Sequence, residues 1–203
     1  MPRRRYDEFV SRLLNASLFS FSVVASKCGE GYAKQLVYRL KRKGLIVELL
    51  RGVYSPKKSP YMLLKAIPLS YVGLGSAAFL HGALNQVTAL TVLTPWASRF
   101  VRPGVRVIAG QKVVVRKISE KMYFGYEYVF VEEINEYVRV SDPEKTLVDA
   151  IYFDYSLLPE MLPGLLELVD EGKLRSYVEE MRKREVRGWR KVREAANALG
   201  LGA

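Results

Sequence analysis

Residues 20–54 read SFSVVASKCGEGYAKQLVYRLKRKGLIVELLRGVY. A helix is expected to begin near Ser20 or Ser22, whose hydroxyls suit an N-cap, and to run through Cys28. The segment Gly29-Glu30-Gly31 then predicts a turn, because glycine breaks helices. Since another helical pattern follows directly, the stretch predicts a helix-turn-helix.

The second helix of this pair is predicted from about Tyr32 to Lys43, before Gly44. Its apolar residues recur at helical spacing and form one stripe, which is expected to face a core. The stripe consists of Ala33, Leu36, Val37 and Leu40. The opposite face carries long polar side chains, namely Lys34, Gln35, Tyr38, Arg39 and Arg42.

A tight hairpin is predicted directly after this helix. Leu45–Leu50 and Val53–Tyr54 are short apolar runs on either side of Arg51 and Gly52. Glycine supplies the unusual backbone dihedral that such a turn needs. A helix-turn-helix followed by a hairpin predicts a winged helix, with an arginine at the tip of the wing.

A winged helix of this kind is expected to bind double-stranded DNA. An α-helix fits the major groove, where long polar side chains reach the base edges, so we assign base reading to Lys34, Gln35, Tyr38 and Arg39. Cations nearer the helix end, in the wing and in the flanking segments suit phosphates. These are Arg3, Arg4, Arg5, Lys41, Arg42, Lys43, Arg51, Lys57 and Lys58.

The distribution of charge supports a localised binding surface. The chain has a net charge of +11, and residues 1–60 hold 13 Lys or Arg against 4 Asp or Glu. Residues 182–203 hold 7 against 2, whereas the middle of the chain is mildly acidic. Two alternatives stay open: the polar face of residues 34–42 is simply solvated, or the winged helix docks a protein instead of DNA.

The rest of the chain predicts an α+β domain over residues 61–203, after a Pro- and Lys-rich linker at residues 56–60 that ends the DNA-binding domain of residues 1–60. Short helices are expected at 61–67 and 75–84. Five β-branched or aromatic runs predict a mostly antiparallel sheet, at 90–93, 105–108, 113–118, 126–131 and 137–140. Helices are expected from residue 143, and at 158–169, 173–183 and 189–199. The basic tail that includes this last helix offers a second basic surface, which could extend the DNA footprint or bind RNA or membrane, or alternatively is simply solvated; its residues are Arg184, Arg187, Arg190, Lys191 and Arg193.

Several segments resemble the abortive-infection AbiE antitoxins, which are transcriptional regulators of type IV toxin–antitoxin pairs. They are RLKRKGLIVELLRGVY at 39–54, GLGSAAFLHG at 73–82, LTVLTP at 90–95 and VSDPEKTLVD at 140–149. The resemblance implies a repressor that binds operator DNA of its own operon and opposes a nucleotidyltransferase-like toxin without necessarily binding it. The chain departs from the commonest helix-turn-helix by a turn that is one residue longer, and by its basic tail.

Enzymatic chemistry is not expected. Gly73, Gly75 and Ser76 suit a phosphate-binding turn, but the strand at 90–93 has no carboxylates to hold Mg²⁺. His81 is the only histidine and is expected to pack or to bond a helix end. Asp142 and Glu144 are expected to cap the helix at 143, and Asp149 to bond the helix backbone or Lys145. No metal or cofactor is therefore expected.

The remaining expectations concern partners and location. Cys28 is the single cysteine, which excludes an internal disulfide, and no apolar run reaches membrane-spanning length. We therefore expect a cytoplasmic protein without a membrane span, and homodimerisation is compatible with the sequence. The acidic residues Glu132, Glu133 and Glu136 are read as a solvated turn, or alternatively as a mimic or repellent of nucleic acid.

Overall fold

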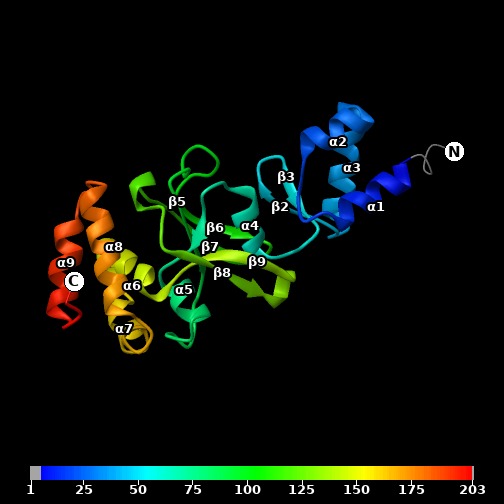
Figure 1. The fold of residues 1–203 in the computed structure, drawn as a ribbon. Helices are drawn as coiled ribbons and strands as arrows, with labels where there is room; N and C mark the ends of the chain where they lie inside the picture. The colour runs from blue at the N-terminus through cyan, green and yellow to red at the C-terminus, as the bar shows by residue number, and fades with distance from the viewer. Residues whose placement is uncertain (1–5, 203) are drawn as a thin grey trace.

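The structure is a computed structural model that describes residues 6–202 (Figure 1). An N-terminal unit, residues 6–55, contains three helices and a small antiparallel sheet. The helices are α1 (Asp7–Asn15), α2 (Phe21–Cys28) and α3 (Glu30–Arg42), and the strands are β1 (Phe19–Ser20), β2 (Val47–Leu50) and β3 (Val53–Ser55). The strands lie in the order β1-β3-β2, so β1 closes the hairpin back onto the start of α2.

The turn between α2 and α3 is shorter than the sequence predicts. Gly29 alone separates the two helices, because its N–H donates to Ala25 and its C=O accepts from Ala33. Gly29 has φ +79° and ψ 151°, a conformation that is essentially restricted to glycine. The expectation that Glu30 and Gly31 belong to the turn is therefore wrong, since both residues are helical. The sequence predicted a turn one residue longer than in the commonest helix-turn-helix, whereas the turn in the structure consists of Gly29 alone.

The core of the N-terminal unit confirms the predicted stripe. Ala33, Leu36, Val37 and Leu40 are all buried and pack with Val24 and Ile46. Ser20 caps α2 by accepting a hydrogen bond from the N–H of Val23. The polar face of α3 is consequently turned away from the core.

The C-terminal unit, residues 60–202, places a six-stranded sheet between a small helical region and a layer of helices (Figure 1). Its strand order is β6-β7-β5-β4-β9-β8, with two parallel pairs, β4·β9 and β5·β7, among antiparallel ones. The strands are β4 (Tyr71–Val72), β5 (Leu90–Thr94), β6 (Gly104–Ile108), β7 (Gln111–Lys117), β8 (Tyr126–Val131) and β9 (Glu136–Ser141). The helices are η2 (Pro60–Met62), α4 (Leu63–Ala66), α5 (Gly75–Leu80), η3 (Glu120–Met122), η4 (Glu132–Ile134), α6 (Pro143–Tyr152), α7 (Leu158–Leu166), α8 (Glu171–Lys183) and α9 (Trp189–Ala198).

The predicted α+β class is confirmed, and all five predicted strands are present. The central strand β4 was not predicted, because two residues are too short to show a period. The helix expected over 75–84 ends at Leu80. No helix in the described residues is long and apolar enough to cross a membrane.

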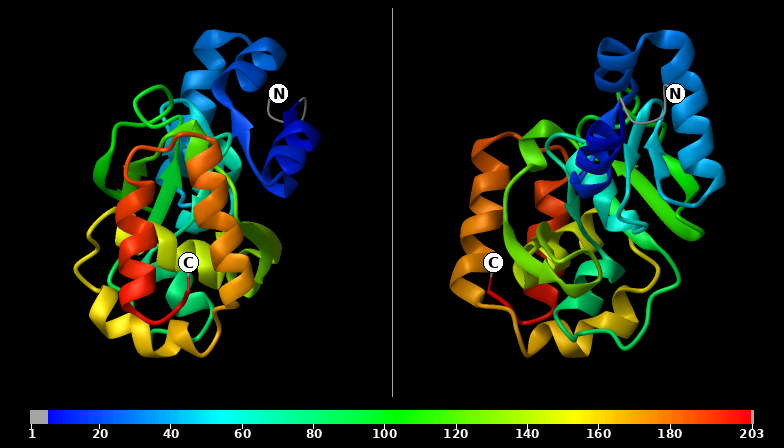
Figure 2. Two further views of the ribbon diagram at one scale, coloured as in Figure 1. Left: turned by 60° about the vertical axis from the view of Figure 1, so that its left-hand side comes forward. Right: turned by 90° about the vertical axis from the view of Figure 1, so that its right-hand side faces the viewer.

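The two faces of the large sheet have different covers. One face, represented by Tyr71 and Leu93, packs against α6, α7, α8 and α9. The other face packs against η2 and α4, and it also receives Leu49 from the hairpin of the N-terminal unit. Figure 2 shows the N-terminal unit projecting from this side of the sheet. The hairpin is therefore part of both units.

The start of α6 contains a fully buried ion pair. Lys145 and Asp149 pair one turn apart, and Tyr71 donates a hydrogen bond of 2.9 Å to Asp149. Desolvation lowers the pKa of Lys145 and raises the pKa of Asp149, and their mutual attraction opposes both shifts. The expected link between Lys145 and Asp149 is confirmed, and the pair lies inside the core instead of on the surface.

Two further expectations at this helix have different outcomes. Asp142 caps α6 by accepting from the N–H of Lys145, as predicted. Glu144 does not cap its own helix: it accepts from the N–H of Asp170 and pairs with Lys173, so it anchors α8 instead. His81 contacts the C=O of Ser141 through Nε2 at 2.7 Å, which agrees with the expected structural role.

Candidate nucleic-acid interface

The polar face of α3 is exposed along its length. Lys34, Gln35, Tyr38 and Arg39 all lie on the surface, and the ring of Tyr38 is among the most exposed large side chains of the described residues at 64%. An exposed aromatic ring on a helix of 13 residues, about 20 Å long, is a large contact surface that no other part of the described chain covers. The structure thus brings the four predicted base-reading residues together on one face.

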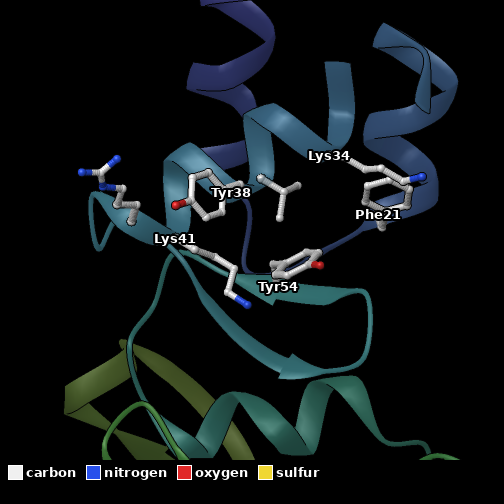
Figure 3. Close-up of a pocket in the computed structure, with 7 residues that line it drawn as sticks. Phe21, Lys34, Tyr38, Lys41 and Tyr54 are labelled. Carbon is white, nitrogen blue, oxygen red and sulfur yellow. The ribbon is translucent and has the colours of Figure 1, made fainter. Parts of the chain in front are cut away.

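A groove of about 640 Å³ runs beside this face, between α3 and the hairpin (Figure 3). Cations and aromatic rings line it. The lining residues are Phe21, Lys34, Val37, Tyr38, Lys41, Arg42 and Tyr54. Phe21 and Tyr54 were not predicted as site residues, because their approach depends on the pairing of β1 with β3, which the sequence pattern does not reveal. Val37 was predicted only as part of the buried stripe of α3.

The hairpin tip is fixed next to the groove. Gly52 has φ +75°, its N–H donates to Glu48 at 3.2 Å, and its C=O accepts from the N–H of Phe21 at 2.7 Å. Arg51 is exposed at this tip. The tip therefore holds a cation close to the start of α2, at a position that does not depend on a flexible loop.

Some of the predicted cations are already paired with carboxylates. Lys41 forms a 2.5 Å pair with Glu48 of the hairpin, and Lys34 pairs with Glu30 at 2.7 Å on the surface. Burial alone would raise the pKa of Glu48, but hydrogen bonds from Lys41 and Gly52 outweigh it and keep the pKa below its ordinary value. Lys41 thus has a counter-charge in a partly exposed pair, whereas the more exposed pair Lys34–Glu30 is weaker.

Other cations in this region have no such partner. Within residues 6–202, Arg42, Lys43, Arg51 and Lys58 are exposed and form no ion pair. Arg39 lies over the ring of Tyr32, with 5.4 Å between its Cζ and the ring centroid. Arg3, Arg4 and Arg5 lie outside the described residues.

Lys57 has a different place from the one expected. It pairs with Glu136 and donates a 2.6 Å hydrogen bond to the C=O of Ile134, both in the C-terminal unit. Glu136 also receives Lys65 at 3.0 Å and the hydroxyl of Ser17 at 2.5 Å. Lys57 therefore joins the two units, and Glu136, which was read as part of a solvated turn, is its partner. Glu132 and Glu133 remain exposed.

The second predicted basic surface lies far from α3, at the opposite end of the molecule (Figure 1). Arg190 and Arg193 lie over the ring of Trp189, with Cζ-to-centroid distances of 5.6 and 5.0 Å, and Arg187 is exposed. Arg184 pairs with Glu180, and Lys191 pairs with Asp154. The five residues therefore divide into three exposed arginines and two paired cations.

The glycine-serine turn is explained by packing. A side chain at Gly73 would approach Leu93 to 2.4 Å, and Ser76 bonds the backbone of Ala89 and Thr91. The neighbouring strand β5 is buried throughout and carries no acid. In residues 6–202, no group of three His, Cys, Asp or Glu side chains lies close enough together to hold a metal ion.

Comparison with solved structures finds the same fold elsewhere. The RV2827C protein from Mycobacterium tuberculosis matches 97% of this chain and 80% of its own length, with a TM-score of 0.60 and 15% identity. The match includes both units, so their combination in one chain is not peculiar to this protein. No protein-family model and no curated protein sequence matches the chain.

Proposed function

We propose that this chain binds double-stranded DNA, with α3 in the major groove and the hairpin on the flanking backbone. The observation that carries this proposal is the exposed face of α3. Lys34, Gln35 and Tyr38 stand side by side there, and Arg42 and Arg51 flank them without acidic partners in the described residues. This combination provides donors and acceptors for base edges together with cations for phosphates.

The roles of the cations follow from their surroundings. Arg42, Lys43, Arg51 and Lys58 are available for phosphates, so each neutralised phosphate releases counterions on binding. Lys41 loses part of its value for this purpose because Glu48 already balances it. Lys57 is occupied by Glu136 and does not belong to the proposed interface. We therefore assign the backbone contacts to the first group and to the arm of Arg3, Arg4 and Arg5.

We further propose that the chain is an autoregulating repressor and the antitoxin of a type IV toxin–antitoxin system. This part rests on the resemblance of four sequence segments to the AbiE antitoxins. Three of those segments, at 73–82, 90–95 and 140–149, form the centre of the C-terminal unit around β5 and α6. The operator, and a nucleotidyltransferase-like toxin encoded by an adjacent gene, are the partners that this proposal requires.

A gel shift on DNA from upstream of the chain's own gene tests DNA reading. The variant changes Lys34, Gln35 and Tyr38 to Ala, and a matched control changes the exposed Lys117, Tyr137 and Asn197 to Ala in the C-terminal unit. We expect the first variant to lose binding or preference for this DNA over unrelated DNA, and the control to bind like the wild type. Unchanged affinity and preference in the first variant would remove α3 as the reading helix.

The antitoxin proposal needs a separate test. Co-expression of the chain with the product of an adjacent nucleotidyltransferase-like gene should restore growth that this product alone arrests. The triple variant of α3 should still restore growth when expressed from a foreign promoter, because the C-terminal unit is intact in it. Arrested growth in the presence of the wild-type chain contradicts the antitoxin role but leaves DNA binding standing.

A further inference from the structure

Two adjoining cavities lie on the C-terminal unit on either side of residues 87–89. The smaller has a volume of about 150 Å³ and the larger about 250 Å³, and both are lined by Val87, Thr88, Ala89 and Lys112. The smaller one continues to Arg116, Thr91 and Tyr155, and the larger one to Tyr61, Ser76 and Gln111. The two cavities thus share Lys112 and residues 87–89, and together they are called the recess below.

Arg116 is held in place at the inner end of this recess. It is half-buried on β7, and its Cζ lies 5.5 Å from the ring centroid of Phe153 and 6.0 Å from that of Tyr155. Lys112 lies four residues earlier on the same strand, so both side chains leave the same face of β7. Two cations from one strand thus line the smaller cavity.

Neither cation has an acidic partner. No carboxylate lines either cavity, and within residues 6–202 neither Arg116 nor Lys112 forms an ion pair. Arg116 is half-buried and Lys112 is exposed, whereas the half-buried Lys57 pairs with Glu136 and the fully buried Lys145 pairs with Asp149. Removing a guanidinium from water without a counter-charge is costly, and a bound anion would offset that cost.

We propose that this recess binds a small phosphate-bearing molecule, with its phosphate on Arg116 and Lys112 in the smaller cavity. A phosphate monoester carries between one and two negative charges at neutral pH, which two cations match, and Arg presents a planar pair of donors to it. The smaller cavity has room for about five water molecules, which suits one phosphate group. Thr88 and Thr91 are hydroxyl-bearing residues of its lining, and Tyr155 contributes its ring.

The body of the ligand extends past Lys112 into the larger cavity. Tyr61 offers a ring and Gln111 an amide there, so the cavity suits a polar or heterocyclic group attached to the phosphate. Tyr61 also follows the linker from the hairpin directly along the chain. The site is independent of the proposed DNA-binding surface, and its test does not involve DNA.

Isothermal titration calorimetry on the full chain tests the site, with AMP and inorganic phosphate as probes and sodium acetate as the comparison anion. We expect saturable binding of AMP, weaker binding of phosphate and none of acetate. R116Q and K112Q should each weaken AMP binding about tenfold or more, which corresponds to the loss of one charged hydrogen bond. R106Q on the neighbouring strand β6 and K117Q on β7 change cations that do not line the recess, and both variants should bind like the wild type.

Two controls keep the outcome clear. R116K preserves the charge while losing the planar donor pair, so it should fold and bind with intermediate affinity. K112Q changes an exposed residue and should not affect folding, so it tests the site even where R116Q is unstable. Absence of saturable binding of both probes to the wild type, or equal AMP affinity in K112Q and the wild type, overturns the proposal.

Discussion

Lys57 and Glu136 form an ion pair that joins the two units of the chain, seventy-nine residues apart in the sequence. Glu136 is mostly buried and also accepts from Lys65 and Ser17. Its three donors come from the loop after α1 (Ser17), the linker (Lys57) and α4 (Lys65). Burial opposes the charge on Glu136, but the hydrogen bonds from Lys57, Ser17 and Lys65 outweigh it and lower its pKa to about 2. The polar part of the contact between the two units is therefore centred on one carboxylate, beside the apolar packing of Leu49.

The first prediction concerns the acid dependence of this contact. Because the pKa of Glu136 is lowered by folding, its contribution to stability is present above the ordinary pKa of about 4.5 and is lost as the pH falls toward 2. E136Q should reduce the free energy of unfolding by about 1–2 kcal/mol at pH 7 and by much less at pH 3. Urea denaturation at both pH values measures this, with the exposed E132Q as a control that should change neither. A loss for E136Q that is equal at the two pH values would contradict the assigned role.

The second prediction tests the one-residue turn between α2 and α3. Gly29→Ala should destabilise the chain by about 1–3 kcal/mol, because alanine does not tolerate φ +79° with ψ 151°, although no atom blocks its Cβ. Gly31→Ala should stabilise the chain by about 0.5–1 kcal/mol, since Gly31 is helical and its Cβ also meets open space. Thermal or urea unfolding should show a lower free energy of unfolding for Gly29→Ala and a higher one for Gly31→Ala than for the wild type. Destabilisation by both would place the turn at 29–31 after all.

The third prediction separates the cations that are proposed to contact phosphates from the cation that joins the units. R42Q and R51Q should each reduce the slope of log affinity against log salt by about one, the value for one phosphate contact on duplex DNA. K57Q should leave the slope unchanged, because Glu136 occupies Lys57. Fluorescence anisotropy with labelled upstream DNA over a series of salt concentrations measures all three. A slope in K57Q that falls as far as in R51Q would return Lys57 to the interface.

The fourth prediction concerns the buried pair Lys145 and Asp149. K145M should destabilise the chain by about 3–5 kcal/mol, since it leaves the Asp149 carboxyl buried without its partner. The double variant K145M/D149L should recover a large part of this loss because it removes both charges together. Urea denaturation of the two variants and D149L completes a double-mutant cycle. Additive effects in this cycle would show that the two side chains act independently.

Local patterns predicted most of the helices and strands, because their signals lie within a few residues. The stripe from Ala33 to Leu40 and the cap at Asp142 are examples in which spacing alone specifies the environment. The turn at Gly29 was misplaced because Gly31 looks like a helix breaker, while its cost within α3 is small enough for neighbouring contacts to absorb. Propensity alone does not decide which of two nearby glycines ends a helix.

Features that depend on distant contacts were not predictable. β4 has two residues and is recognisable as a strand only from its pairing with β5 and β9, and the parallel pair β4·β9 follows from that position. Lys57 looked like a phosphate contact because nothing near it in sequence is acidic, and Glu136 reaches it only through the fold. For the same reason, the recess between Lys112 and Arg116 has no signature in the sequence beyond two cations on one strand.

The burial of Leu49 limits how this protein can be divided. The hairpin contributes Leu49 to the core that β5, β7, β9 and α4 share. A cut near residue 60 therefore separates this apolar side chain from the residues that bury it. A truncated N-terminal unit would expose that side chain, and the remaining chain would lose the cover of its sheet. Exchange of the N-terminal unit between relatives, by recombination or by engineering, therefore requires that the hairpin and the surface beneath it are transferred together.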